Sequence, residues 1–317
     1  MWFLFALITM LAWGTADMFY KKGADPDEPS TGLRTVIMVG LVMGVHAVFY
    51  MLAADVSFAL SDMVKYLPVS FFYIISMFVG YVGLRYLMLS ISSPVQNSSG
   101  AVTLILCCAL FVQSLGTLDI IGVIIICVGV FLLALLEKHA DMDELSKIAD
   151  KKHTVSAFAI LFPIGYCVLD SMGTFLDAIY LGEAETAARF SRLSHILENF
   201  EVMNEDTALM AYEFTFLAVG IIAFLFLWLV KKEKFTFRGE TNRLLAAACE
   251  TAGQFTYVRA MSGRAVIAAP MIASYSIVSL ILGRLFLKEK LTKKQYVVVT
   301  FIILGIALLG VSEGLAE

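Results

Sequence analysis

The sequence predicts an all-α polytopic membrane protein with ten transmembrane helices, arranged as two inverted five-helix repeats. The composition is 60% hydrophobic and the mean hydropathy is +0.84, far above the values of a soluble domain. Charged residues make up only 16% of the chain and gather between long apolar runs. A stretch of the first half also recurs in the second half at one fixed offset, which is the usual construction of secondary transporters.

Ten apolar segments can be counted, each roughly 20 residues or more and therefore able to cross about 30 Å of hydrocarbon. They cover residues 2–20, 33–54, 67–88, 92–112, 118–136, 154–181, 207–230, 242–261, 264–286 and 293–312. We expect a first five-helix repeat over 1–137, a charged linker over 138–153 and a second repeat over 154–317. An odd number of spans in each half makes the second half enter the membrane from the opposite side.

The internal repeat is visible at an offset of 176 positions, which places Pro94 on Pro270 and runs without a gap to Glu137 on Glu313. Thirteen of these 44 positions are identical. Shared Leu and Ile are common in any two membrane segments, but Pro, Ser and Gly shared at one offset are not. The identical pairs include Pro94/Pro270, Ser98/Ser274 and Gly129/Gly305.

Several function classes are disfavoured by what the sequence lacks. All five cysteines lie inside apolar runs, and no Cys/His pair has the spacing of a metal site. Neither a phosphate-binding glycine loop nor a nucleophile–base motif is visible. We therefore expect no enzyme, no metal, no cofactor and no nucleic-acid partner. The expected partners are a small-molecule substrate and membrane lipid, and the chain is expected to be a monomer or a homodimer.

Three features make the chain resemble a known family. Trp13-Gly14 lies in the first apolar segment, Pro94 and Pro270 open the fourth segment of each half, and Leu287–Gln295 forms a basic hairpin before the last segment. On these residues the chain resembles the EamA branch of the drug/metabolite transporter superfamily. The resemblance implies a ten-helix bundle whose helices 1, 3, 4, 6, 8 and 9 line a central cavity. It also implies transport of small metabolites, commonly export of amino acids or amines with proton or exchange coupling.

Three acidic residues within apolar segments are the first candidates for a site. A charge at membrane depth costs at least about 2.5–3.5 kcal/mol on insertion scales, so it usually faces a cavity. Glu250 is followed by Gln254 and Tyr257, which share its helix face. Asp170 follows Tyr166, and Asp17 follows Trp13, by four residues in each case. For Asp17 the alternative is an interfacial residue that pairs with the basic end of its segment.

The remaining candidates are aromatic and amide side chains. The rings of Trp13, Tyr166, Tyr257 and Tyr275 are expected to offer π faces to a cation, or else to pack between helices. Gln96 and Asn97 follow Pro94, where an interrupted helix can bind a polar ligand or clamp a neighbouring helix. Three further titratable residues are expected at segment ends or in ordinary packing rather than in the site. They are Asp177, Glu213 and His46.

Orientation is predicted from the distribution of Lys and Arg. The loops between segments 1–2, 3–4, 5–6, 7–8 and 9–10, with the adjoining segment ends, hold 18 of the 23 basic residues. The positive-inside rule then places both termini outside the cytoplasm. Members of the family that the chain resembles usually keep their termini inside, so the two orientations remain open.

The sequence predicts a secondary active transporter, an exporter or exchanger, of a small polar metabolite in a bacterial cytoplasmic membrane. An amine, another organic cation or an amino acid is preferred, because acids and aromatic rings share the expected cavity. The alternatives are a flippase or transporter of a lipid-linked or sugar-phosphate compound, which would want basic residues near the centre, and a non-transporting membrane sensor.

Overall fold

The computed structural model describes residues 1–25, 27–87, 89–110, 115–148, 159, 161–181, 195, 202–288 and 292–316. These described ranges are helical, with no strand among them. The helices are α1 (Trp2–Gly23), α2 (Thr31–Ala53), α3 (Leu60–Gly83), α4 (Leu89–Asn97), α5 (Ser99–Leu110), α6 (Thr117–Ile148), α7 (Leu161–Tyr180), α10 (Glu205–Leu225), α11 (Phe237–Ala273), α12 (Ser276–Phe286) and α13 (Lys293–Ala316). A π-helical turn, η2 (Phe226–Val230), continues α10. The prediction of an all-α fold is confirmed.

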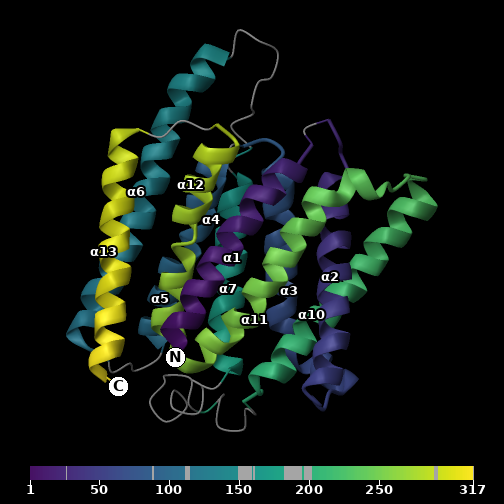
Figure 1. Ribbon diagram of the computed structural model, residues 1–317, viewed down its shortest axis with the longest axis horizontal. Helices are drawn as coiled ribbons and strands as arrows, with labels where there is room; N and C mark the ends of the chain where they lie inside the picture. Colours follow the sequence, from purple (N-terminus) through teal and green to yellow (C-terminus); the bar gives the residue numbers. More distant parts are fainter. Residues whose placement is uncertain are drawn as a thin grey trace.

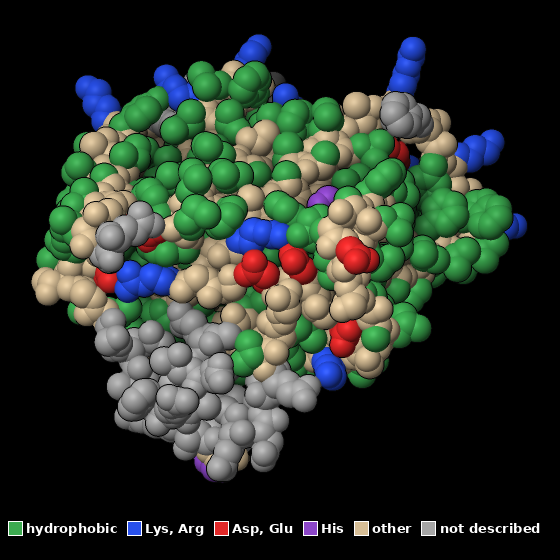
Figure 2. Space-filling model, turned by 60° about the horizontal axis from the view of Figure 1, so that its bottom comes forward, with side chains coloured by type: hydrophobic (Ala, Val, Ile, Leu, Met, Phe, Trp, Pro, Cys, Tyr) green, Lys and Arg blue, Asp and Glu red, His purple; other side chains and the backbone are tan. Residues whose placement is uncertain are grey.

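The surface of the bundle is suited to hydrocarbon. Among the described residues, six helical stretches are long and apolar enough to cross a membrane: α1, α2, α3, α10 with η2, α11 with α12, and α13. Large apolar side chains point outward on these stretches, for example Phe49 and Val297, which are 71% and 69% exposed. Figure 2 shows hydrophobic side chains over most of the visible face, and Lys and Arg side chains projecting from its upper edge. Such a surface is stable in lipid and costly in water.

The helices pack in pairs. α1 runs along α11 and α3 along α7, while α2 packs on α10 and α6 on α13. In Figure 1 the α6–α13 pair forms one edge of the bundle and the α2–α10 pair lies towards the other, with the remaining helices between them. Both termini lie at the same end, where the Met1 amino group pairs with Glu313 Oε1 at 2.7 Å.

Glycine residues allow the two outer pairs to approach closely. A Cβ on Gly40 of α2 would lie 3.2 Å from the Cα of Gly220 on α10. A Cβ on Gly122 of α6 would lie 3.1 Å from the carbonyl oxygen of Gly305 on α13. Small residues at such crossings bring the helix backbones into contact, which is a main source of helix association in membranes.

Two predicted helices are interrupted in the middle. The predicted segment 92–112 is divided into α4 and α5 at Ser98, and the predicted segment 264–286 is divided between Ala273 and Ser276. Proline precedes each break by four residues and lacks the N–H for a helix hydrogen bond. At the first break the Pro94 carbonyl accepts hydrogen bonds from both the N–H and the hydroxyl of Ser98, at 3.1 and 3.0 Å.

The expectation that the prolines open their helices was wrong. Pro94 is the sixth residue of α4, which begins at Leu89. Pro270 lies within α11, six residues after Arg264, whose backbone (φ −153°, ψ 68°) marks a kink. The two prolines therefore hold equivalent places, one turn before a break, rather than at a helix start.

Other boundaries also differ from the prediction. α3 begins at Leu60 instead of near residue 67, because Asp62 Oδ2 accepts a hydrogen bond from the Ala59 N–H and fixes an earlier start. α6 continues to Ile148 and takes in much of the expected linker 138–153. The rest of that linker lies outside the described residues, as do residues 154–158 of the predicted sixth segment.

Candidate functional site

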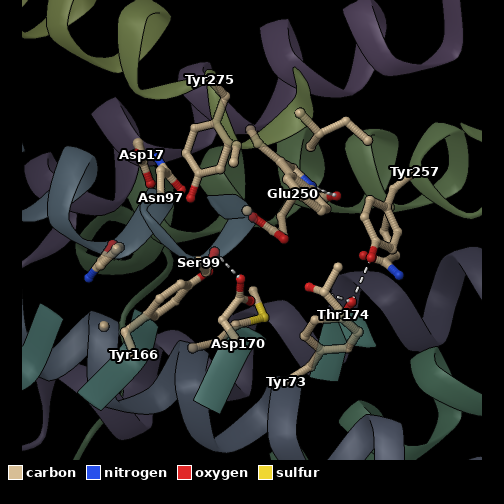
Figure 3. A pocket seen from close by; sticks show the side chains of 18 of the residues that line it. Asp17, Tyr73, Asn97, Ser99, Tyr166, Asp170, Thr174, Glu250, Tyr257 and Tyr275 are labelled. Carbon is tan, nitrogen blue, oxygen red and sulfur yellow. Dashed lines mark hydrogen bonds between the residues drawn. The ribbon is translucent and has the colours of Figure 1, made fainter. Parts of the chain in front are cut away.

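A cavity lies at the centre of the bundle, bounded by α1, α3, α4, α5, α7, α10 and α11 and by the break before α12. It encloses about 820 Å³ of empty space, including the part open to the surroundings. All ten residues that the sequence singled out line it, and Figure 3 shows the cavity with most of them labelled. They are Trp13, Asp17, Gln96, Asn97, Tyr166, Asp170, Glu250, Gln254, Tyr257 and Tyr275. Their presence around one cavity makes a shared role feasible, and ligand binding by them stays a prediction.

Asp17 belongs to the cavity wall and is tied to both interrupted helices. Its Oδ2 accepts hydrogen bonds from Ser93 on α4 and Ser279 on α12, each at 2.7 Å. Asn97 Nδ2 in turn donates to Ser93 Oγ at 3.1 Å. The ammonium group of Lys21 donates to the carbonyls of Leu84 and Leu87 at 2.7 and 2.6 Å. The interfacial alternative for Asp17 is therefore not what the structure shows.

Asp170 is held in a similar way from the neighbouring helix. Ser99, the first residue of α5, donates to Asp170 Oδ2 at 2.7 Å (Figure 3). Ser171 Oγ donates to the Ser99 carbonyl at 3.2 Å, and Thr103 donates to the Ser171 carbonyl at 3.3 Å. These bonds join α7 to α5 directly behind the carboxyl group and fix its position in the wall.

Glu250 differs from both aspartates. Its side chain is 8% exposed, and no described side chain donates a hydrogen bond to its carboxyl oxygens. The indole N–H of Trp13 donates to its backbone carbonyl at 3.2 Å instead. Figure 3 places the carboxyl group towards the middle of the cavity, in the same space as Asp170. Glu250 therefore has hydrogen-bonding capacity left for a ligand or a proton.

One wall of the cavity is aromatic. The ring of Trp13 stacks on Tyr257 with centroids 5.0 Å apart and meets Tyr275 edge-on at 5.9 Å. The hydroxyl of Tyr257 lies 2.6 Å from that of Tyr73, which donates to Thr174 at 3.1 Å. Stacked and edge-on pairs are favourable ring arrangements, and the faces of such rings attract cations.

Two glycines provide the space that the rings need. A Cβ on Gly253 of α11 would lie 2.3 Å from Cδ1 of Trp13, and a Cβ on Gly80 of α3 would lie 2.7 Å from Cδ2 of Tyr166. Both rings therefore rest directly on the backbone of a neighbouring helix. The role of these glycines was missed from the sequence, because a single glycine in an apolar run gives no sign of what packs on it.

A buried amide also faces the cavity without a partner. Gln96 is 4% exposed, and its Nε2 has no hydrogen-bond partner in the described part of the chain. An unpaired buried donor is costly, about 1–3 kcal/mol. A ligand with an acceptor atom would relieve that cost.

Two acids expected at segment ends are instead buried. Asp177 is fully buried and accepts a hydrogen bond from Tyr66. Glu213 is also fully buried, and His46 Nδ1 lies 2.8 and 2.9 Å from its two carboxyl oxygens. The expectation of solvated or interfacial positions was wrong for both, and His46 does have an acidic partner. The two members of each pair are more than a hundred residues apart, so spacing in the sequence could not reveal them.

The sequence matches the EamA-like transporter family over residues 1–135 and 201–311, which is more than half of the chain. The chain belongs to the EamA-like transporter family. The resemblance drawn from Trp13, the two prolines and the basic hairpin is thereby confirmed. EamA-like proteins are membrane transporters of the drug/metabolite type and are generally not enzymes, so the chain is a multi-pass integral membrane protein of that type.

A comparison with solved structures supports the fold. One, titled only "Crystal structure of protein", superposes with a TM-score of 0.63 at 12% identity. The match covers 99% of this EamA-like chain and 98% of the other. At that identity the likeness shows the fold alone. No curated protein matches the chain.

Proposed function

We propose that the protein is a secondary active transporter that moves a small amine, another organic cation or an amino acid through the central cavity. The observation that carries the proposal is the charge of the cavity wall. Its described lining holds three carboxyl groups, those of Asp17, Asp170 and Glu250, and no Lys, Arg or His. A wall with this charge attracts cations and repels anions.

The hydrogen-bonding groups of the cavity that have no protein partner indicate which class of ligand fits. Glu250 offers acceptors that no described side chain occupies, and Gln96 Nε2 offers a donor. An ammonium group would bond to Glu250 and lie near the aromatic wall, where cation–π attraction adds about 0.5–2 kcal/mol. A carboxylate or another acceptor on the same ligand would bond to Gln96. An amine therefore uses part of the site, and an amino acid uses all of it.

Proton coupling follows from the same carboxyl group. A buried carboxyl group loses hydration, which disfavours its charged form, while a bound cation favours it. Proton and cation therefore compete for Glu250, and competition for one site is the basis of exchange. In this proposal Asp17 and Asp170 remain bound to their serines, and Glu250 alternates between a proton and the substrate.

Inverted repeats would explain how the cavity opens to each side in turn. The interrupted helices lie 176 residues apart, and the α1–α11 contact mirrors the α3–α7 contact. The α2–α10 and α6–α13 pairs each join corresponding helices of the two halves. These relations support ten spans in two repeats, 1–137 and 154–317, whose rocking around a fixed site gives alternating access. We place the protein in the bacterial cytoplasmic membrane and assign it no enzymatic step.

The other candidate functions lack such support. A carrier of sugar phosphates or of lipid-linked phosphates needs basic groups at the centre, and the described cavity wall has none. Among the described residues no group of His, Cys, Asp and Glu is arranged to hold a metal ion. A non-transporting sensor would keep a binding cavity but show no flux.

A thermal-shift series on the purified protein tests the charge preference. Phenylethylamine, phenylalanine and phenylpropionate share one skeleton and differ in charge, and glucose 6-phosphate represents the sugar phosphates. We expect stabilisation by the cation and the zwitterion only. Stabilisation by phenylpropionate or by glucose 6-phosphate alone would refute the cation proposal.

Transport by Glu250→Gln in proteoliposomes then tests the mechanism. Glutamine preserves the shape and removes the charge, so amine uptake driven by a proton gradient should fall to the level of empty vesicles. Glu213→Gln is the matched control, since Glu213 is also a buried acid but lies outside the cavity lining. Normal, pH-dependent transport by Glu250→Gln would show that Glu250 is structural.

A further inference from the structure

An apolar groove runs along the outside of the bundle between α2 and α10. Its α2 side is formed by Ile37, Met38 and Leu41, and its α10 side by Gly220, Ile221 and Phe224. The groove holds about 670 Å³ of empty space, including the part open to the surroundings. Gly220 leaves part of the groove open, because it has no side chain to fill it.

The groove lies on helices that face the hydrocarbon. Leu41 and Ile221 on its rims are 48% and 49% exposed, whereas Ile37 and Met38 at its base are 6% and 8% exposed. α2 and α10 are both among the stretches able to cross a membrane. An apolar groove on membrane-spanning helices matches an acyl chain in polarity.

One end of the groove is closed by a reversal of the chain after η2. The Lys231 N–H donates to the Phe226 carbonyl at 3.2 Å, and the Glu233 N–H donates to the Leu227 carbonyl at 3.0 Å. Phe235 thereby returns to the groove, with its ring 5.4 Å from that of Phe224. The segment that ends the groove thus also carries Lys231, Lys232 and Lys234.

These three lysines are exposed and available. The carboxylate of Glu233, which lies between them in sequence, bonds to Arg34 at 2.9 Å and accepts from Ser30 at 2.8 Å. Arg34 also pairs with Glu240 at 2.6 Å and lies over the Phe235 ring at 4.6 Å. Among the ion pairs of the described residues, none involves Lys231, Lys232 or Lys234. Positive charge is therefore left unneutralised beside an apolar groove.

We propose that this groove binds an anionic phospholipid, with one acyl chain between α2 and α10 and the phosphate against Lys231, Lys232 and Lys234. The site is separate from the central cavity, and the proposal does not depend on the transported substrate. Lysine groups near an anionic head group contribute about 1 kcal/mol each, which corresponds to about a fivefold preference per lysine engaged. A zwitterionic phospholipid would fill the groove without that gain.

Trp228 provides a reporter at the site. It is one of three tryptophans, and its ring stacks on Phe224 with centroids 6.0 Å apart. In a Trp2→Phe/Trp13→Phe background it becomes the only tryptophan. Quenching by phosphatidylglycerol with brominated acyl chains is then compared with quenching by brominated phosphatidylcholine, each diluted into unbrominated phosphatidylcholine bilayers.

We expect a relative binding constant of about five or more in favour of phosphatidylglycerol. The triple variant Lys231→Gln/Lys232→Gln/Lys234→Gln should reduce it to about one, and because these residues are exposed the fold should persist. Leu41→Phe, which fills the groove, should reduce quenching by both lipids. Val45→Phe is its control, since Val45 lies one turn further along α2, is 50% exposed and is absent from the groove lining.

Two results would overturn the proposal. Equal quenching by the two brominated lipids in the parent protein would show that the lysines select no head group. Cross-linking across the groove between two copies, abolished by Leu41→Phe and unaffected by phosphatidylglycerol, would assign the groove to a dimer contact instead.

Discussion

Replacement of Gly253 by alanine is a direct test of whether the aromatic wall binds the substrate. A methyl group at this position would lie 2.3 Å from Cδ1 and 2.4 Å from Nε1 of Trp13. Normal contact begins at 3.4 Å, so the indole ring would have to retreat by about 1 Å. That movement weakens its hydrogen bond to the Glu250 carbonyl, now 3.2 Å, and its stacking on Tyr257.

The expected loss of stability is moderate. Insertion of an extra methyl group into a close-packed site costs about 1–3 kcal/mol. Alanine recovers part of that cost, because glycine within a helix is less favourable by about 0.5–1 kcal/mol. The variant should therefore fold, with a melting temperature a few degrees lower in detergent.

The relative effect of Gly253→Ala on amine affinity should be larger than its effect on stability. If Trp13 contributes a cation–π contact of about 0.5–2 kcal/mol, its displacement weakens amine binding about 2- to 30-fold. Isothermal titration of the best-binding amine from the thermal-shift series measures this change. Gly165→Ala is the matched control, because its Cβ would meet only Val79 at 3.6 Å, an ordinary contact, and it adjoins the cavity residue Tyr166.

An unchanged affinity in Gly253→Ala, together with the expected drop in melting temperature, would refute the reasoning. It would mean that the ring moves without affecting the ligand. Trp13 would then be a packing residue, and the aromatic wall would have no share in recognition.

Two further predictions concern the rest of the chain. His46→Ala should lower stability by about 1–3 kcal/mol, because it leaves the buried Glu213 carboxyl without its partner. A melting curve measures this loss, and the double variant His46→Ala/Glu213→Leu should recover most of it. If the basic loops are cytoplasmic, a cysteine at Lys293, in a cysteine-free background, should resist an impermeant maleimide in intact cells. A cysteine at the exposed Ser57 should react. The reverse labelling pattern would establish cytoplasmic termini.

The positions of the helices in the sequence were predictable, because the hydrocarbon of a membrane restricts the length and composition of every span. Every span must be long and apolar, so runs such as 33–54 and 293–312 nearly coincide with α2 and α13. An interrupted helix was expected at Pro94, and the structure places that break at Ser98; the matching interruption at Ser274 was not predicted, although Pro270 was noticed. Hydropathy does not register them, because a helix can bend or break at Pro and Ser while its composition stays apolar.

The cavity residues were predictable for a related reason. An acid inside an apolar run has few tolerable environments, so Glu250 and Asp170 indicated a polar interior from sequence alone. Asp177 and Glu213 were misjudged because they lie near the ends of their runs, where a solvated position is just as natural. Only the fold shows that Tyr66 and His46 meet them.

The symmetry of the cavity supports the proposal that Glu250, rather than an aspartate, meets the substrate. Trp13 precedes Asp17, and Tyr166 precedes Asp170, by four residues in each case, and each ring rests on a glycine of the helix packed beside it. The two aspartates are also alike in accepting serine hydroxyls.

Glu250 breaks this symmetry. The cavity residues of α3 are Tyr73, Met77, Gly80 and Tyr81, so α3 has no carboxyl group to match the one on α11. Asp17 and Asp170 accept hydrogen bonds that hold the interrupted helices in place. No described side chain donates to the carboxyl oxygens of Glu250. In the mechanism that we propose, a substrate that enters between the two repeats therefore meets one carboxyl group able to exchange a proton for a cation, and that group belongs to the second half alone.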